Sequence, residues 1–149
     1  MFLIRPSKSQ DISTIVEFQL RLADETEDLT LNKSVLTAGV EALLADPSRG
    51  SYSVVEHDGK IIGCYLITFE WSDWRNGVVW WIQSVFVLTE FRRKGIYAGL
   101  YAHVRMMAEK NESVKGIRLY VDRRNKAAQD VYRRLGMNGD HYQVFEWMK

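Results

Sequence analysis

Three consecutive cations stand immediately before an expected helix. Arg92, Arg93 and Lys94 precede Gly95, and apolar residues at helical spacing follow from Ile96 onward. The first N–H groups of a helix are unpaired and bind phosphate oxygens, whereas cations placed there oppose the helix dipole. The segment therefore predicts an anion site, with a solvated basic loop as the alternative interpretation.

Charge is divided unevenly between the parts of the chain that meet at this segment. Residues 1–91 carry 7 Lys and Arg against 13 Asp and Glu, whereas residues 92–149 carry 13 against 6, within a net charge of +1. This asymmetry suggests that one part handles anions and the other cations. The alternative is an unevenly charged, solvated surface.

Composition excludes several classes of protein. The single cysteine, Cys64, excludes an intramolecular disulfide framework and a multi-cysteine zinc site, and it fits a reducing, cytoplasmic compartment. The histidines lack the spacing of metal ligands, so no metal is expected. No apolar run approaches the roughly 20 residues of a membrane helix. We expect one domain over residues 1–149 and no membrane partner.

Hydrophobic periodicity predicts the elements that position these residues. Helices are expected at about 12–22, 34–44, 96–110 and 125–136, and strands at 2–5, 52–56, 61–69, 78–87, 117–121 and 142–148. Asp58-Gly59 is typical of a tight hairpin turn. The apolar run 78–87 is typical of a central strand buried on both faces. The order βααβββαβαβ indicates an α/β protein with a mixed sheet.

Two motifs in this order resemble a known family. A strand, then Arg-x-x-Gly-x-(Gly/Ala), then a helix is similar to the acetyl-coenzyme A pyrophosphate loop of the GNAT acetyltransferases, with Tyr97 at the position of the last Gly or Ala. Asn125-x-x-Ala-x-x-x-Tyr132, followed by Gly136 and Met137, resembles the family's Asn-x-x-Ala-x-x-x-Tyr…Gly-Phe segment. The resemblance extends over almost the whole chain in element order and implies a GNAT-like fold.

The resemblance also implies how acetyl-CoA, a co-substrate, is held. In this fold the central strands, here 78–87 and 117–121, splay apart around the cofactor, and a main-chain amide at the splay stabilises the oxyanion. Asn125 is then expected to bond the pantetheine arm or neighbouring backbone, although a plain N-cap is its alternative. Pantetheine would pair with main-chain groups near Phe86 and Val87. The pyrophosphate would lie on the backbone of Arg92, Arg93, Lys94, Gly95, Ile96 and Tyr97.

Tyr132 is, by the same resemblance, the general acid that protonates the departing CoA thiolate, and it is also expected to contact the cofactor. A phenol with a pKa of about 10 donates to a thiolate whose acid has a pKa of about 8.5 when the two are in contact. The alternative for Tyr132 is a half-buried packing residue.

The acceptor side depends on less specific signals. A primary amine with a pKa of about 10.4 is neutral in only about one molecule in 2,500 at pH 7, so its attack needs a carboxylate or an ordered water. The candidate carboxylates are Glu25, Glu27, Glu70 and Asp73. Glu27 and Glu25 are favoured as the acidic rim that holds a cationic substrate, with ordinary surface acids as the alternative. Two further features are candidates on the substrate side. The amide of Gln83 could position a water, and Trp71, Asp73 and Trp74 could form a partly aromatic wall for an ammonium group.

These observations predict an acyltransferase, an N-acetyltransferase that moves the acetyl group of acetyl-CoA directly to a primary amine of a small molecule or a peptide. The many aromatic residues and an exposed last strand favour a homodimer. Two alternatives remain open: a non-catalytic acyl-CoA sensor, and a nucleic-acid-binding domain that uses the basic C-terminal part. Nucleic acid is the less favoured partner because no binding motif is present.

Overall fold

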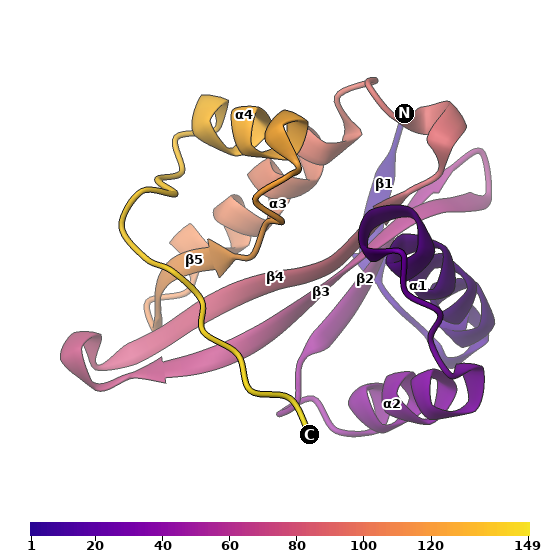
Figure 1. Ribbon diagram of the computed structural model, residues 1–149, viewed down its shortest axis with the longest axis horizontal. Helices are drawn as coiled ribbons and strands as arrows, with labels where there is room; N and C mark the ends of the chain where they lie inside the picture. Colours follow the sequence, from indigo (N-terminus) through magenta and orange to yellow (C-terminus); the bar gives the residue numbers. More distant parts are fainter. The chain divides into compact units, whose positions relative to one another are not determined.

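A five-stranded mixed sheet organises residues 1–119 (Figure 1). The computed structural model describes residues 1–149, which divide into two units, 1–119 and 120–149. The strands pair antiparallel except for the parallel pair β4–β5. Their order across the sheet is β1 (Leu3–Pro6), β2 (Ser51–His57), β3 (Lys60–Ser72), β4 (Gly77–Val87) and β5 (Val114–Leu119).

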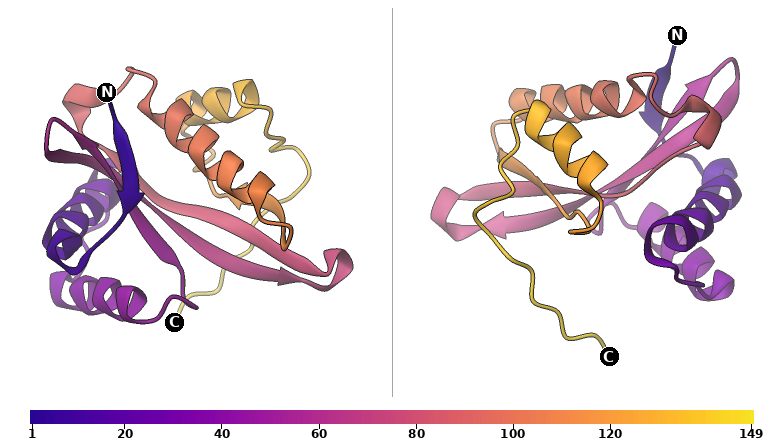
Figure 2. Two further views of the ribbon diagram at one scale, coloured as in Figure 1. Left: turned by 180° about the vertical axis from the view of Figure 1, so that it is seen from behind. Right: turned by 45° about the horizontal axis from the view of Figure 1, so that its top comes forward.

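Three helices cover the two faces of this sheet (Figure 2). On one face lie α1 (Ile12–Glu27) and α2 (Lys33–Ala45), and on the opposite face lies α3 (Ile96–Lys110). Side chains at i, i+3 and i+4 spacing are buried along α1 and α3, as expected of helices that pack on a sheet. The expected α/β fold with a mixed sheet is confirmed. No helix is long and apolar enough to cross a membrane.

The turn between β2 and β3 illustrates a local prediction that is confirmed. Asp58 and Gly59 have φ values of 48° and 75°. A type I′ turn needs positive φ at both central residues, and Gly59 adopts it without a Cβ penalty. The two strands therefore form a hairpin in which His57 faces Lys60.

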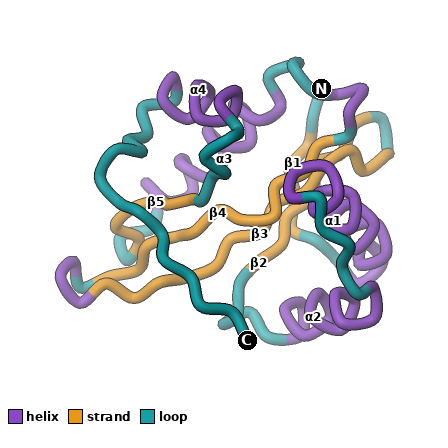
Figure 3. Tube along the Cα trace, viewed as in Figure 1, coloured by secondary structure: helices purple, strands orange, loops and turns teal.

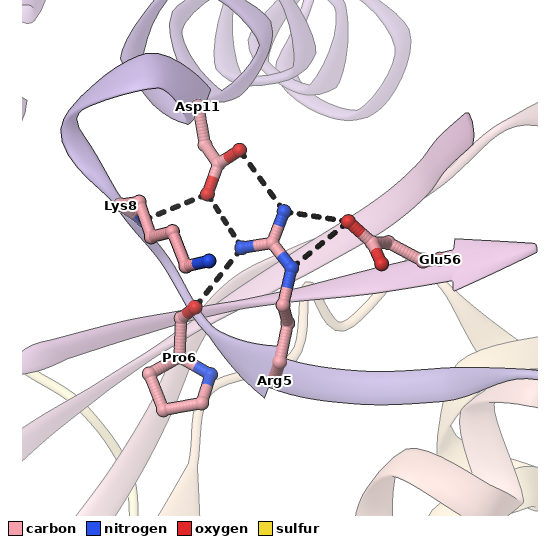
Figure 4. A network of polar contacts seen from close by, with 5 residues as sticks. All are labelled: Arg5, Pro6, Lys8, Asp11 and Glu56. Atoms are coloured by element: carbon pink, nitrogen blue, oxygen red, sulfur yellow. Dashed lines mark hydrogen bonds and ion pairs between the residues drawn. The ribbon is translucent and has the colours of Figure 1, made fainter. Parts of the chain in front are cut away.

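A buried ionic cluster fixes the beginning of the chain to the sheet (Figure 4). Asp11, in the short 3-10 turn before α1, is 2% exposed. Its carboxylate accepts from both Nη atoms of Arg5 on β1, at 2.7 and 3.1 Å, and from the backbone N–H of Lys8 at 2.7 Å. Arg5 also donates to Glu56 on β2 at 2.6 and 2.8 Å. The Arg5 hydrogen bonds hold the pKa of Asp11 below its usual value.

Strands β3 and β4 continue past the end of β2 as an arm, along which β4 also pairs with β5 (Figure 1). The β2–β3 pairing ends at Ser51–Ile67, whereas β3 pairs with β4 as far as Ser72–Gly77. A 3-10 turn, Asp73–Arg75, closes the arm.

The second unit, residues 120–149, contains α4 (Lys126–Arg134). Asn125 caps it, since its side chain accepts from the N–H of Ala128 at 3.0 Å. Gly136, with φ of 85°, ends it, and the N–H of Met137 donates back to the carbonyl of Tyr132. The helix that the sequence predicts at about 125–136 is therefore confirmed.

Two strand predictions need correction. The strand expected at 117–121 is β5, Val114–Leu119, and the strand expected at 142–148 is not formed (Figure 3). Residues 138–149 contain no strand, and the observed order is βααβββαβα. Alternating aromatic and β-branched residues do predict a strand, but a strand needs a partner for its main-chain groups, and none pairs with this segment.

Candidate active site

The β4–β5 pair is open over the second half of β4. Its parallel pairing runs from Val78–Val114 to Ile82–Leu119 and stops there. The edge of β4 beyond Ile82 that would face β5 therefore has no strand partner. An unpaired edge presents N–H and C=O groups to any extended molecule that lies along it. The pairing stops where β5 ends, at Leu119, so the second half of β4 continues without a neighbour on this side.

A β-bulge lies where this opening begins. Cys64 pairs with Phe86 and Leu66 pairs with Gln83, so a single β3 residue lies opposite Ser84 and Val85 of β4. Ser84 has φ of 55°, in the left-handed region. A residue other than glycine in that region carries a strain of about 1–3 kcal/mol and persists only where its surroundings hold it. The bulge bends β4 at the point where it leaves β5.

The loop between β4 and α3 has the backbone of an anion site. Arg93 has φ of 62° and Gly95, the N-cap of α3, has φ of 76°. Left-handed residues in a turn direct successive N–H groups to one side, and the positive end of the α3 dipole adds to them. A Cβ at Gly95 would meet no atom within 4 Å, so the space above this backbone is open.

Arg92 is anchored to its own protein rather than extended into solvent. Its Nε donates to the carbonyl of Val87 at 2.8 Å and its Nη2 to Glu25 on α1 at 2.5 Å. Its guanidinium lies over the ring of Phe86, 5.5 Å from the ring centre. Arg92 therefore fixes the start of the loop, and the carboxylate of Glu25 is shared between Arg92 and Arg21, the latter at 3.5 Å.

Few groups of Phe86 and Val87 are available to contact a ligand. The Phe86 side chain is 2% exposed and packs on Phe18 of α1, with ring centres 4.8 Å apart. The carbonyl of Val87 already accepts from Arg92. Any cofactor contact here must come from the remaining main-chain groups.

The first two residues of α3 direct their side chains into the protein. The Tyr97 hydroxyl is buried, and Ile96 is a core residue.

The predicted acceptor residues are not brought together. Trp71, Asp73 and Trp74 lie at the end of the β3–β4 arm, and the two indoles are 64% and 88% exposed. Ten residues of β4 at about 3.3 Å each place Gly77 roughly 33 Å from Val87. Glu25 and the exposed Glu27, the last residue of α1, belong to the Val87 end because Glu25 pairs with Arg92. The aromatic wall and the acidic rim are thus separate.

Between these ends, side chains on neighbouring strands form polar contacts that the sequence did not reveal. Gln83 donates to the hydroxyl of Thr68. Glu70 on β3 accepts from the Trp81 indole at 3.2 Å and from Arg118 on β5 at 2.5 Å. Arginines of the basic part are paired elsewhere too, since Arg124 lies 2.7 Å from Asp122 and Arg133 lies 3.6 Å from Asp130. These pairs reduce the positive charge available for nucleic acid.

The thiol of Cys64 is not a nucleophile. The side chain is fully buried, and burial raises the pKa of the thiol to about 12. Only the thiolate attacks a thioester efficiently. A covalent intermediate on the single cysteine is therefore excluded at neutral pH.

Asn125 and Tyr132 of the second unit show the features of their alternative interpretations, an N-cap and a half-buried side chain. The Asn125 oxygen is committed to capping α4, and its amide N–H groups are donors that capping does not use. Tyr132 is half-buried on α4, one turn before the glycine stop at Gly136.

The family of the chain follows from comparison with known proteins. The model of the acetyltransferase (GNAT) family matches residues 15–137, which include the bulge, the Arg92–Gly95 loop and α4. The chain belongs to the GNAT acetyltransferase family. Among curated proteins, none matches this GNAT sequence significantly.

Solved structures agree with this assignment. A possible acetyltransferase from Clostridium difficile 630 is 41% identical, with a TM-score of 0.93 over 100% of this chain and 98% of its own. A predicted acetyltransferase with acetyl-CoA from Clostridium acetobutylicum is 21% identical, with a TM-score of 0.78 over 98% and 96%. AAC(6')-Iy in complex with a bisubstrate analog, CoA-S-monomethyl-acetylneamine, is 18% identical, with a TM-score of 0.80 over 100% and 99%. The last two share the GNAT fold.

Proposed function

We propose that this GNAT protein transfers the acetyl group of acetyl-CoA directly to a primary amine of a small molecule or a peptide. The observation that carries the proposal is the unpaired edge of β4 after Ile82, which leads to the left-handed Arg93–Gly95 backbone at the start of α3. Together these offer main-chain partners for an amide-containing arm and N–H groups for a pyrophosphate. The solved acetyltransferase with acetyl-CoA, similar in fold, supports the same co-substrate.

The residues present fit acetyl-CoA. The backbone of Arg92–Tyr97 supplies the pyrophosphate site, with Arg93 and Lys94 as exposed cations beside it. Phe86 and Val87 offer main-chain groups to the pantetheine, and Asn125 offers its amide N–H. When bound, acetyl-CoA supplies the activated acetyl group. In this proposal, a main-chain N–H at the bulge stabilises negative charge on the acetyl oxygen.

Two proton transfers complete the proposal. Tyr132 donates its phenolic proton to the sulfur that leaves. With pKa values of about 10 and 8.5, this transfer is uphill by only about 2 kcal/mol, so a phenol in contact with the thiolate can serve as the acid. On the acceptor side, Glu27 is the better of the two candidate acids, because the charge of Glu25 is neutralised by Arg92. Glu27 removes the amine proton directly or through a water held by Gln83. Trp71, Asp73 and Trp74 extend the acceptor surface only for a long substrate such as a peptide.

The experiment is a thiol-release assay with acetyl-CoA and a panel of amines that includes amino sugars, polyamines and peptides. Wild-type protein should release CoA with at least one amine, and Tyr132→Phe should lower kcat by about 100-fold while the Kd for acetyl-CoA stays within about threefold. Full kcat in Tyr132→Phe would reject the acid role. Acetyl-CoA binding without CoA release across the panel would indicate a sensor, and salt-sensitive RNA binding without acetyl-CoA binding would indicate a nucleic-acid-binding domain.

The cellular and oligomeric context is part of the same proposal. We propose that residues 1–149 work as one acetyltransferase domain, because the family match covers parts of both units. We also propose a homodimer in the cytoplasm, supported by the exposed aromatic side chains of residues 142–148 and by the single unpaired cysteine. Light scattering should give twice the mass of the 17.3 kDa chain, and the monomer mass for Phe145→Ser/Trp147→Ser; a monomeric wild type would reject the dimer.

A further inference from the structure

A polar side chain is buried on the apolar face of α1. Gln19 is 6% exposed and lies among the core residues Ile15, Val16 and Ala23 of that helix. Its Nε2 donates to the carbonyl of Ser84 at 3.0 Å and to the Cys64 sulfur at 3.4 Å. Burial of an amide is unfavourable unless the amide is hydrogen-bonded. The hydrogen bond to Ser84 satisfies the buried Gln19 amide and at the same time holds the Ser84 carbonyl.

That group is the strained peptide of the β4 bulge. Ser84 has φ of 55°, and the regular β3–β4 register is interrupted beside it. A left-handed serine relaxes to an extended conformation unless the surrounding structure holds it. The hydrogen bond from Gln19 fixes the carbonyl of Ser84 toward α1 and thereby opposes this relaxation.

The direction of this carbonyl determines the direction of the next amide. The chain has no cis peptide bond, and in a trans peptide the C=O and the following N–H point in opposite directions. Because the Ser84 carbonyl points to Gln19, the N–H of Val85 points away from α1. This peptide lies just past the last β4–β5 pair, Ile82–Leu119, where the strand edge becomes free.

We infer that Gln19 is a positioning residue for acetyl transfer, which holds the Ser84–Val85 peptide in the orientation that acetyl-CoA meets. This inference rests on the proposed function. Removal of the Gln19 N–H leaves the Ser84 carbonyl with the weaker contact from the Cys64 thiol, at 3.9 Å, and the peptide can turn. The acetyl group then loses an aligned donor, which lowers kcat more than it weakens the binding of the distant pyrophosphate.

The test compares Gln19→Met, which keeps the length of the side chain but removes the N–H donors, with Ile15→Val on the same buried face of α1. Both remove buried groups of α1, but only Gln19 contacts Ser84. We expect Gln19→Met to lower kcat about tenfold, with KM for acetyl-CoA within about threefold, and Ile15→Val to keep the wild-type kcat. Equal losses of kcat in the two variants, or wild-type kcat in Gln19→Met, would overturn the inference.

A second measurement separates failure of this inference from failure of the proposed function. The backbone 15N–1H shifts of Ser84 and Val85 in the unliganded protein should move in Gln19→Met and stay in place in Ile15→Val. If wild-type protein does not turn over acetyl-CoA but these shifts move, the proposed function fails and the hold on the peptide stands. Unchanged shifts in Gln19→Met overturn the inference whatever the activity.

Ser84→Gly provides the conformational control, because glycine adopts positive φ without strain. In that background the peptide needs less support, so Gln19→Met should lower kcat by about threefold rather than tenfold. An undiminished tenfold loss would show that Gln19 does not act through the conformation of Ser84.

Discussion

Asp11 and Gln19 are both buried polar residues near the beginning of the chain. Asp11 contacts charged side chains, whereas Gln19 contacts a main-chain carbonyl. Asp11 meets charged side chains, Arg5 and through it Glu56, where the β1–β2 register is regular. Gln19 meets a main-chain carbonyl, that of Ser84, where the β3–β4 register is broken. The ionic cluster joins elements into a stable sheet, whereas the amide holds one peptide in a conformation that the sheet alone disfavours. Stability and activity are therefore expected to respond to different substitutions.

The largest expected effect is on stability, at the ionic cluster. Asp11→Asn removes one of the two carboxylates that neutralise Arg5 in a largely buried position. Breaking such a pair should lower the free energy of unfolding by about 3 kcal/mol, measured by urea denaturation. At temperatures where the variant is folded, kcat should stay within twofold of wild type. A large loss of kcat in the folded variant would erase the distinction between the two regions.

Acid should affect the same region. Hydrogen bonds from Arg5 lower the pKa of folded Asp11 from 3.8, so the group binds protons more readily in the unfolded chain. Its contribution to stability is therefore complete above the ordinary pKa and is lost as pH falls through the lowered folded value. Urea midpoints measured downward from pH 5 should fall more steeply for wild type than for Asp11→Asn. Parallel curves would show that Asp11 is not the titrating group. The Gln19–Ser84 contact has no charge and contributes nothing to this slope.

The smallest effect is expected at Glu25, which lies between these two kinds of contact. Its pair with Arg92 is partly exposed, so Glu25→Gln should change stability by less than about 1 kcal/mol. Because Arg92 begins the anion loop, KM for acetyl-CoA should rise about threefold. Glu27→Gln is the matched comparison, and because Glu27 is the proposed base, it should lower kcat with the amine and leave KM for acetyl-CoA unchanged. If Glu25→Gln changed the kinetic constants for the amine but not KM for acetyl-CoA, Glu25 would belong to the acceptor site instead.

Features specified by neighbouring residues were predictable from the sequence. The Asp58-Gly59 turn, the Asn125 cap and the bounds of α3 each depend on short-range rules of backbone conformation. The Arg92–Gly95 motif also identified its loop, although the inward anchoring of Arg92 depends on Glu25, 67 positions away in the chain.

Features that depend on contacts between distant segments were missed. The bulge at Ser84 has no local signal, because serine has no preference for positive φ. A signal did exist for Gln19, the polar residue on an otherwise apolar helix face. Residues 142–148 have the alternation of a strand, but alternation does not supply a neighbouring strand. For the acceptor side, the sequence indicated residue types and the strand 78–87. It did not indicate the pair between Glu25 and Arg92, which places the acidic residues at the Val87 end of β4 and away from Trp74.

Amide hydrogen exchange with and without acetyl-CoA tests the central claim most directly. The claim is that acetyl-CoA occupies the free edge of β4 beyond Ile82, beside the bulge, and leaves the ionic cluster untouched. We predict that backbone amides within 83–87 and 93–97 gain at least tenfold protection when acetyl-CoA is saturating, while those of β1 and β2 keep their rates. Acetyl-CoA binding with unchanged exchange at 83–87 would contradict the account.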